Sequence, residues 1–309
     1  MTTPGTEKNQ FRCGMVSIVG RPNTGKSTLL NKIIGQKVSI VSKVPQTTRN
    51  QVRGIYHDER GQIVFIDTPG LVAGKDRLDQ LLKQSALGTI GETDCIIHLI
   101  DAQEPPGFEE EQLVHRLRDV QVPIILGLNK VDLGGKFIPQ YIAFWEKMAG
   151  KPITELKSFT MISLSGKRGT HIDKLLDVLF EQLPEGPALY PEDMIIDVPQ
   201  KMVIADIIRE KLLGVLRQEV PHSVAVFIED MQSQRKNLLH IRAVVLVDRD
   251  SQKGIVIGKD GAVLKKIGTL AREELEGLLE NKVFLELHVK VQKNWRDNNS
   301  ILQDLGYEG

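Results

Sequence analysis

An octapeptide near the start of the chain, Gly20-Arg-Pro-Asn-Thr-Gly-Lys-Ser27, restricts the possible folds more than any other feature. It follows an apolar run at 15–19 and opens an amphipathic stretch at 26–34, which predicts a strand, a loop and a helix in succession. Glycines let such a loop direct its N–H groups at phosphate oxygens, and the helix N-terminus adds partial positive charge. We therefore expect a phosphate-binding loop made of Gly20, Arg21, Pro22, Asn23, Thr24, Gly25, Lys26, Ser27 and Thr28.

Two side chains of this loop have specific expected roles. Lys26 is expected to act in catalysis by reaching the terminal phosphates, and the Ser27 hydroxyl is expected to bind Mg²⁺. A chance glycine-rich turn is the alternative interpretation, and the strand–loop–helix context argues against it.

Short apolar runs alternate with amphipathic stretches through the first 183 residues. The runs, expected as strands, are 15–19, 62–66, 95–100, 123–128 and 159–162. The amphipathic stretches, expected as helices, are 26–34, 77–90, 108–119, 138–148 and 171–182. This alternation predicts an α/β domain with a mainly parallel sheet and helices on both faces. Residues 51–57, before the turn at 58–61, are expected to add an antiparallel edge strand.

The pattern changes after a proline-rich segment. We expect an α/β domain at 11–183, a linker at 184–199 and an α+β domain with a C-terminal tail at 200–309. The second domain is predicted to contain a helix at 200–218, strands at 223–230 and 238–248, a helix at 262–280 and a strand at 282–292.

Composition excludes several classes of protein. The 309 residues carry 40 Lys+Arg and 40 Asp+Glu, so the chain is not a uniformly basic nucleic-acid binder, although a local basic patch is compatible with it. The two cysteines, Cys13 and Cys95, lack a CxxC partner and are expected in buried strands. No apolar run reaches the ~18 residues of a membrane span, and residues 1–10 lack a signal peptide's apolar segment. We expect a cytoplasmic protein, and nothing indicates an oligomer, so we expect a monomer.

Two tetrapeptides directly follow predicted strands and so belong at the ligand-binding edge of the sheet. Asp-Thr-Pro-Gly at 67–70 supplies a carboxylate that can hold Mg²⁺ through water and a glycine N–H that can contact a γ-phosphate. Asn-Lys-Val-Asp at 129–132 supplies a carboxylate that can accept from guanine N1–H and the 2-amino group. Adenine lacks this donor pair, so GTP and GDP are the predicted ligands and polar surface turns the alternative. The residues concerned are Asp67, Thr68, Pro69, Gly70, Asn129, Lys130, Val131 and Asp132.

Together these motifs resemble those of translation-factor-class GTPases, and the resemblance points to two more elements. Gln46-Thr-Thr-Arg49 resembles the first switch, in which Thr48 is expected to bind Mg²⁺ and act with Lys26 and Gly70 in catalysis, with Thr47 as the alternative. Ser163-Leu164 occupies the place of a Ser-Ala pair whose backbone contacts the base.

The residue after Gly70 departs from many small GTPases, which place a glutamine there to orient water. Here it is Leu71, which resembles a subgroup with a hydrophobic residue at this position, so Mg²⁺-dependent hydrolysis is expected to be slow. In related GTPases an asparagine at the position of Asn23 helps to bind K⁺. A local hydrogen bond that caps the loop is the alternative role of Asn23, and the two stay open.

The C-terminal domain contains Ile257-Gly-Lys-Asp-Gly261 ahead of a helical pattern, which resembles the G-x-x-G loop of a type II KH domain. A plain turn is the alternative for so short a motif. The expected RNA-binding residues are Ile257, Gly258, Lys259, Asp260, Gly261, Lys265, Lys266 and Arg272.

The order of motifs from residue 13 to 307 resembles the bacterial Era GTPase family (Era/TrmE type). Segments that carry the resemblance include 20–27, 45–49, 67–70, 219–226, 257–261 and 289–297. The resemblance implies binding of the 3′ end of 16S ribosomal RNA, a role in assembly of the 30S subunit, and occasional peripheral association with the inner face of the cell membrane. A P-loop ATPase or kinase, and an RNA-binding adaptor with an inactive nucleotide domain, are the competing interpretations. The guanine-reading tetrapeptide argues against the first, and intact Lys26, Ser27 and Asp67 against the second.

Overall fold

The computed structural model describes residues 11–42, 44, 47–70, 74, 76–216, 220–235 and 237–307. Contacts divide the chain into two compact units. The first contains Met1–Ser39, Gln51–Leu71 and Ser85–Asp197, and the second contains Ile40–Asn50, Val72–Gln84 and Val198–Gly309. The second unit thus takes two segments from the N-terminal half of the chain, which a single linker at 184–199 does not foresee.

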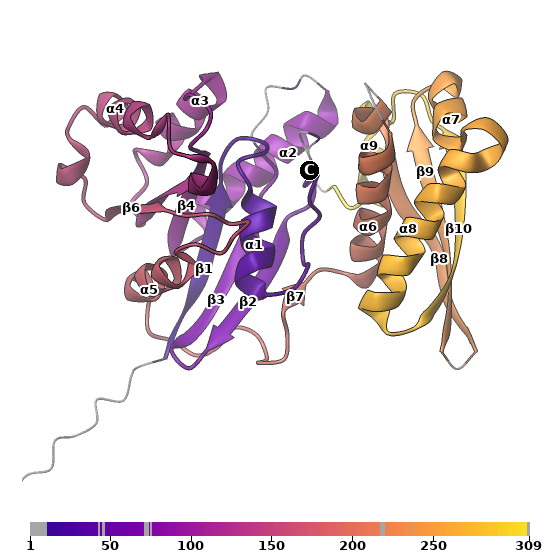
Figure 1. Ribbon diagram of the computed structural model, residues 1–309, viewed down its shortest axis with the longest axis horizontal. Helices are drawn as coiled ribbons and strands as arrows, with labels where there is room; N and C mark the ends of the chain where they lie inside the picture. Colours follow the sequence, from indigo (N-terminus) through magenta and orange to yellow (C-terminus); the bar gives the residue numbers. More distant parts are fainter. Residues whose placement is uncertain are drawn as a thin grey trace, which may run out of the picture. The chain divides into compact units, whose positions relative to one another are not determined.

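A seven-stranded sheet forms the centre of the first unit, counted over the described ranges (Figure 1). Its strands are β1 (Arg12–Val19), β2 (Val52–Asp58), β3 (Gly61–Asp67), β4 (Cys95–Asp101), β5 (Ile124–Asn129), β6 (Phe159–Ser163) and β7 (Ile196–Asp197), in the order β6-β5-β4-β1-β3-β2-β7. Strands β1, β3, β4, β5 and β6 are parallel, which confirms the expected sheet. Strand β2 is antiparallel as expected, but it is not the edge, because β7 pairs with it at Arg53 and Gly54.

Helices cover both faces of this sheet. They are α1 (Lys26–Ile34), α3 (Phe108–Leu117), α4 (Ile138–Ala149) and α5 (Ile172–Gln182), with short 3₁₀ turns η1 (Thr89–Gly91), η2 (Val131–Leu133) and η3 (Ile153–Glu155). Gly54 of β2 faces Leu30 of α1, and Tyr56, two residues on, faces Phe180 of α5, so α1 and α5 share one face (Figure 1). Apolar side chains of α3 and α4 pack with β4 and β5 in a separate core cluster.

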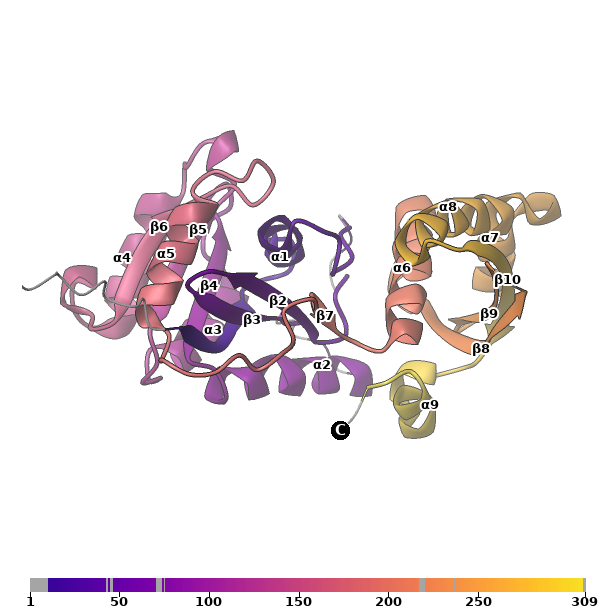
Figure 2. The same ribbon diagram turned by 90° about the horizontal axis from the view of Figure 1, so that it is seen from below.

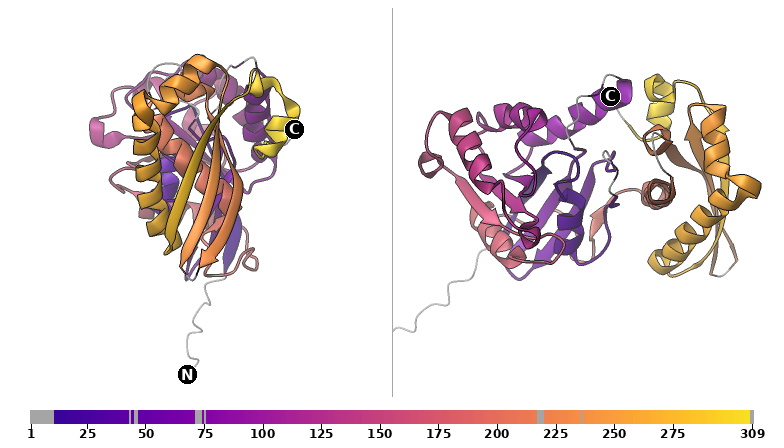
Figure 3. Two further views of the ribbon diagram at one scale, coloured as in Figure 1. Left: turned by 90° about the vertical axis from the view of Figure 1, so that its right-hand side faces the viewer. Right: turned by 45° about the horizontal axis from the view of Figure 1, so that its top comes forward.

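The second unit has the element order α-β-β-α-α-β. It consists of α6 (Gln200–Val215), η4 (Val220–Ser223), β8 (Ala225–Arg235), β9 (Leu238–Val247), α7 (Asp250–Ile257), η5 (Lys259–Gly261), α8 (Ala262–Leu279), β10 (Lys282–Val291), η6 (Trp295–Asp297) and α9 (Asn299–Asp304). The sheet order is β10-β9-β8, with β10 parallel and β8 antiparallel to β9 (Figure 3, left). Helices α6, α7 and α8 pack on one face, and α9 lies on the other (Figure 2).

The face of this sheet that carries α9 has a core of its own. Trp295 is fully buried there beside Val244 and Leu246 of β9. Helix α2 (Arg77–Gly88) contributes its first two turns, through Leu78, Leu81 and Leu82. The first turns of α2 therefore belong to this unit, because their apolar side chains complete the cluster.

Several boundaries differ from the sequence-based expectation. Helix α2 ends at Gly88 rather than 90, and α6 ends at Val215 rather than 218, where Leu216 turns to extended backbone. Strand β8 continues to Arg235, five residues past the expected end. Both cysteines are buried free thiols, as expected. Within the described ranges, no helix combines the length and apolar character needed to cross a lipid bilayer.

Strand β4 is buried along its whole length, whereas β6 lies at a sheet edge, and this difference predicts unequal costs of truncation. Ile97→Ala in β4 should lower the free energy of unfolding by about 2–5 kcal/mol, because it leaves a cavity in a close-packed interior. Met161→Ala in β6, where the side chain is 39% exposed, should cost about 1 kcal/mol or less. Urea unfolding of both variants checks the difference, and equal losses would contradict the burial argument.

Candidate functional site

The loop between β1 and α1 has the conformation expected of a phosphate-binding loop. Helix α1 begins at Lys26, and Gly25 before it has a left-handed φ of 99°. A side chain at Gly25 would place its Cβ 2.5 Å from Asn129 Nδ2, so only glycine fits between this loop and β5. The N-terminus of α1 therefore opens directly onto the loop, where backbone N–H groups can meet an anion.

Lys26 is held inside the loop. Its Nζ donates to the carbonyl oxygens of Gly20 and Arg21, at 2.9 Å each. Burial lowers the pKa of Lys26 to about 8, and the charges of Asp67 and Glu110 only partly oppose this. A bound phosphate would favour the charged ammonium, so the lysine is placed to gain a partner when nucleotide arrives.

Ser27 and Asp67, the two residues expected to hold Mg²⁺, are in hydrogen-bond contact. Ser27 Oγ donates to Asp67 Oδ2 at 2.6 Å, and Ser39 Oγ donates to the same oxygen at 2.8 Å. Asp67 is fully buried, and its Oδ1 has no hydrogen-bond partner among the described residues. Burial raises the pKa of Asp67, against the effects of Lys26 and the two serines. A buried carboxylate oxygen without a donor beside a hydroxyl is a donor set that fits Mg²⁺.

Asn129 and Lys130 tie the end of β5 to the phosphate-binding loop. Asn129 Nδ2 donates to the Thr24 carbonyl at 2.7 Å, and Lys130 Nζ donates to the Asn23 carbonyl at 2.8 Å. Lys130 also forms an ion pair with Asp101 at the end of β4. These two side chains thus connect the tetrapeptide 129–132, expected to read guanine, with the loop expected to bind phosphate.

Asp132 is oriented by the loop that follows β6. A hydrogen bond from the Ser165 hydroxyl, more than any other interaction, holds the pKa of Asp132 below its usual range. Arg168 adds an ion pair at 3.4 Å. The carboxylate is therefore kept ionised and able to accept hydrogen bonds from a base.

The structure corrects the position expected for the base-contacting pair after β6. The Leu164 N–H donates to the Leu128 carbonyl within the sheet, at 2.9 Å, so it is not available to a nucleotide. Ser163 is exposed, and its carbonyl contacts the imidazole of His171. Ser165 instead meets Asp132, and the Gly166 N–H donates to Asn129 Oδ1 at 2.9 Å.

The residues after β6 that meet Asp132 and Asn129 are thus Ser165 and Gly166, two positions beyond the sequence-based choice. Leu164 is fully buried because the strand pairing continues one residue past β6, and a large apolar side chain fits that core position. The pair of small residues at 165–166 was the signal that could have shown this from the sequence.

Gly70 approaches the phosphate-binding loop closely, since a Cβ there would lie 2.9 Å from the backbone nitrogen of Pro22. Leu71, the residue expected to replace a catalytic glutamine, lies outside the described residues, as does Gln46. Thr47 and Thr48 belong to the second unit and are buried there. The structure therefore does not unite Thr48 with Ser27 and Asp67 in one unit, and the choice between the two threonines stays open.

The G-x-x-G loop joins α7 to α8, with left-handed backbone at Gly258, Asp260 and Gly261. Ile257 is the last residue of α7. Lys259 and Asp260 are exposed at the loop, and the predicted cations of α8 are also exposed, namely Lys265, Lys266 and Arg272. The basic side chains foreseen for RNA binding therefore lie on the loop and along the helix that follows it.

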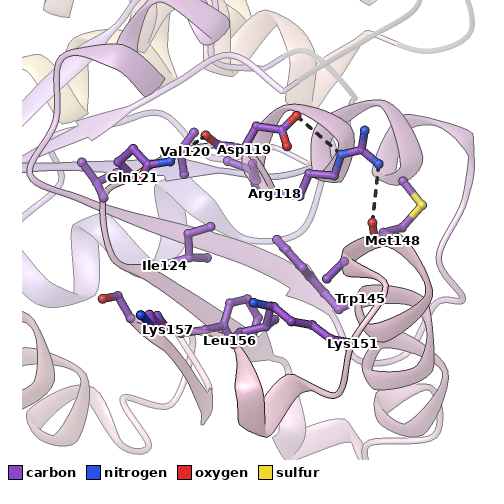
Figure 4. Close-up of a pocket in the computed structure, with 15 residues that line it drawn as sticks. Arg118, Asp119, Val120, Gln121, Ile124, Trp145, Met148, Lys151, Leu156 and Lys157 are labelled. Atoms are coloured by element: carbon purple, nitrogen blue, oxygen red, sulfur yellow. Dashed lines mark hydrogen bonds and ion pairs between the residues drawn. The ribbon is translucent and has the colours of Figure 1, made fainter.

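A cavity of about 620 Å³ lies in the first unit, at the ends of β5 and β6 opposite to those that carry the nucleotide motifs (Figure 4). It is bordered by the start of β5 at Ile124, the start of β6 at Phe159 and the C-terminal ends of α3 and α4. Nucleotide motifs lie at the carboxyl ends of these strands, so this cavity is not the nucleotide site. Arg118, one of the cations that line it, contacts the Met148 carbonyl at the end of α4, a common way to satisfy a helix terminus.

Comparison with known proteins agrees with both units. A family model described as 50S ribosome-binding GTPase matches residues 15–130, and one described as KH domain matches 219–296. A protein of Halothermothrix orenii named GTPase Era is 44% identical over 299 residues, which cover 97% of this chain and 99% of that one. The chain belongs to the Era GTPase family.

Two solved Era structures are similar to the whole chain. A variant of Aquifex aeolicus Era bound to GDP and AlF₄⁻ has a TM-score of 0.90 and 38% identity, and the match covers 97% of this chain and 100% of that one. An Era complex with MgGDPNP and nucleotides 1506–1542 of 16S ribosomal RNA gives the same values. As a member of the family, the chain is a GTPase with a P-loop domain followed by a KH domain.

Asp132 predicts the nucleotide preference of this Era-family protein. In Asp132→Asn the side chain can no longer accept from both guanine N1–H and the 2-amino group, so GTP affinity should fall by about 100-fold or more. Xanthosine triphosphate carries a carbonyl in place of the 2-amino group and should become the preferred ligand. Competition binding with GTP, ATP and xanthosine triphosphate measures this. Comparable ATP and GTP binding by the unmutated chain would overturn the guanine role of Asp132.

Proposed function

We propose that the chain is a GTP-regulated RNA-binding protein that recognises the 3′ end of 16S ribosomal RNA and acts in assembly of the 30S subunit. The observation that carries this proposal is the Era complex with MgGDPNP and a 16S ribosomal RNA fragment, a protein 38% identical to this chain along its full length. The KH fold and the exposed basic side chains after its G-x-x-G loop support it.

For the RNA site, we propose contact by the loop 257–261 and by the start of α8. Left-handed residues at both glycines let the loop backbone approach a nucleic-acid strand. Lys259, Lys265 and Lys266 supply phosphate contacts, whereas the exposed carboxylate of Asp260 opposes them. Recognition of sequence would then come from bases held against the domain rather than from charge.

For the metal site, we propose Mg²⁺ held by Ser27, by Asp67 through water, and by the hydroxyl of Thr48 or Thr47. The buried Asp67 Oδ1 without a donor supports this site. The ion would neutralise charge on the β- and γ-phosphates. Lys26 would bind the same phosphates, and the Gly70 N–H would contact the γ-phosphate.

The chain's hydrolysis is proposed to be slow, because Leu71 cannot orient water or stabilise charge. Asn23 has a left-handed φ of 64° within the phosphate-binding loop, a conformation that asparagine tolerates. This geometry is compatible with both roles of Asn23, a K⁺ ligand and a side chain that caps the loop.

Hydrolysis should be slower by about tenfold or more in Na⁺ than in K⁺ if Asn23 binds the cation, because the smaller ion fits the same oxygens poorly. Phosphate release at fixed ionic strength measures this, with Asn23→Ala as the variant that should lose the difference. Leu71→Ala should change turnover far less than Lys26→Ala. Equal rates in the two salts would contradict a K⁺-binding role for Asn23 and would leave the hydrogen bond that caps the loop as its role.

Regulation is proposed to act through residues 40–50, the segment that contains Thr47 and Thr48. In the second unit, the buried Arg49 donates to the Val224 carbonyl at 2.8 Å, and Arg209 of α6 donates to the Thr47 carbonyl. The Val41 N–H donates to Glu210 at 2.9 Å. The segment expected to bind Mg²⁺ is therefore held by the unit that contains the KH fold.

This packing has an electrostatic cost that favours a switch. Arg49 and Arg209 are each 3% exposed and lie close enough to repel, and burial together with Arg209 lowers the pKa of Arg49 to about 10. An alternative arrangement in which 40–50 binds Mg²⁺ and the γ-phosphate would relieve this repulsion. GTP and RNA would then influence each other through one segment, and the coupling must be reciprocal.

RNA affinity should therefore differ between GDP and a non-hydrolysable GTP analogue, by about tenfold for a coupling of ~1.4 kcal/mol. Fluorescence anisotropy with a labelled 16S 3′-end oligonucleotide measures this. RNA should change the affinity for the GTP analogue by the same factor. Identical RNA affinities in both nucleotide states would contradict the coupling between the two sites and mean two independent modules. They would not contradict RNA binding itself.

Gly261→Asp separates RNA binding from nucleotide binding. A Cβ at Gly261 meets no atom within 4 Å, so the only strain on an aspartate there is the left-handed φ of 76°, which aspartate tolerates better than most residues. Its carboxylate should then repel phosphates. Gly258→Asp is a poorer probe, because its Cβ would lie 2.4 Å from Val263. Gly261→Asp should abolish RNA binding and keep GTP binding, whereas Lys151→Ala, in the first unit, should change neither.

The expected cytoplasmic location and peripheral membrane association stay predictions.

A further inference from the structure

A buried charged network links the phosphate-binding loop to helices α3 and α4. Glu110 of α3 is fully buried, and its Oε2 lies 2.6 Å from Arg21 Nε. Arg21 Nη2 donates to the Tyr141 hydroxyl of α4 at 2.8 Å and to the Pro105 carbonyl at 3.1 Å. The Tyr141 hydroxyl in turn donates to Glu110 Oε2 at 3.2 Å. The Arg21 side chain is thus fixed by three separate partners.

His98 of β4 completes the network from the other side. Trp145 Nε1 donates to His98 Nδ1 at 3.3 Å, and an indole N–H can only donate. His98 Nδ1 must therefore be unprotonated, so the proton lies on Nε2 and is donated to Glu110 Oε1, 2.6 Å away. Both carboxylate oxygens of Glu110 are engaged, and the neutral histidine orients the side chain toward Arg21.

The network keeps Glu110 ionised in the protein interior. Burial disfavours the carboxylate, but the His98 hydrogen bond and the charge of Arg21 outweigh it and hold the pKa of Glu110 below its usual range. A buried carboxylate–guanidinium pair tolerates the loss of both partners far better than the loss of one. Arg21 and Glu110 are therefore expected to act as a single unit.

Arg21 connects this network to the phosphate site through its own backbone. The Arg21 carbonyl accepts hydrogen bonds from Lys26 Nζ at 2.9 Å and from Thr24 Oγ1 at 3.0 Å. Displacement of the Arg21 side chain would move this carbonyl and with it the ammonium group that meets the phosphates. Neither sequence motifs nor the family comparison attributes a role to Glu110 or His98.

We propose that Glu110, oriented by His98, is a positioning residue for nucleotide binding, because it holds the Arg21 side chain and thereby the phosphate-binding loop in its binding conformation. The proposal concerns the GTPase site and does not depend on RNA binding. A purely structural ion pair would also stabilise the fold, so the test has to separate affinity from stability.

Glu110→Gln is the main variant. The glutamine oxygen can still accept from His98, but its NH₂ group then faces Arg21 Nε, so the guanidinium loses its ion-pair partner and keeps only Tyr141 and the Pro105 carbonyl. The dissociation constant for GDP should rise about tenfold, a coupling typical of contacting groups. Arg21→Gln should have a similar effect, and the double variant should be no worse than either single one. Tyr141→Phe, a smaller change, should raise the constant by a few fold.

A matched control is Asp58→Asn, which breaks a carboxylate–arginine pair to Arg60, at 2.6 Å, in the β2–β3 hairpin of the same unit. It should lower the unfolding midpoint without changing the GDP dissociation constant. The affinity ratio of GDP to inosine diphosphate reports on the base side at Asp132, and it should stay unchanged in all variants.

Titration of the full chain with fluorescent GDP measures the dissociation constants that test the proposal. Urea unfolding shows whether each variant is folded. An unchanged dissociation constant in folded Glu110→Gln, or about 100-fold weakening in the double variant, would overturn the proposal. So would an equal loss of affinity in Asp58→Asn, since that would show a general effect of stability. If Glu110→Gln does not fold, Arg21→Gln and Tyr141→Phe carry the same test.

Discussion

The backbone conformation of residues 20–27 is the constraint on which the rest of the nucleotide site depends. For N–H groups to face an anion, the loop carbonyls must point inward, and a buried carbonyl needs a donor. Lys26 donates to the carbonyls of Gly20 and Arg21, and Asn129 donates to that of Thr24. The residues that mark a GTPase in the sequence are therefore also the residues that hold the loop in shape, so phosphate binding and guanine recognition share one framework.

The division of the chain into units has a similar physical basis. Residues 40–50 and 72–84 are the segments that follow the phosphate-binding loop and the Asp-Thr-Pro-Gly motif, yet their buried partners lie in the second unit. Arg49 contacts the Val224 carbonyl, and Leu78 packs with the cluster around Trp295. A segment with partners in one unit and expected ligands in the other can be stable in two arrangements, which is what a nucleotide-dependent switch requires.

Most of the fold followed from local patterns, and the failures have identifiable reasons. The apolar runs and the loop 20–27 led to the correct sheet, because strands covered on both faces are apolar throughout. Strand β7 has only two residues and exists because Arg53 and Gly54 of β2 offer a free edge, which no local pattern reports. Helix α9 is six residues long, with Asn298 as its only clear start signal. Ser163-Leu164 fits the motif of the base-contacting pair, but Leu164 pairs within the sheet and Ser165 is the residue that meets Asp132.

The sequence by itself predicted the chemistry: a phosphate-binding loop, a carboxylate expected to bind metal, a tetrapeptide expected to read guanine and a KH loop, each carried by a few adjacent residues whose spacing is local. Only the tertiary structure decided which distant residues support them. Ser39 lies 28 positions from Asp67, Glu110 lies 89 positions from Arg21, and the contact between Thr47 and Arg209 spans 162 positions. Such contacts arise where buried polar groups must find partners in whichever element the fold brings near, so they leave no periodic mark in the sequence.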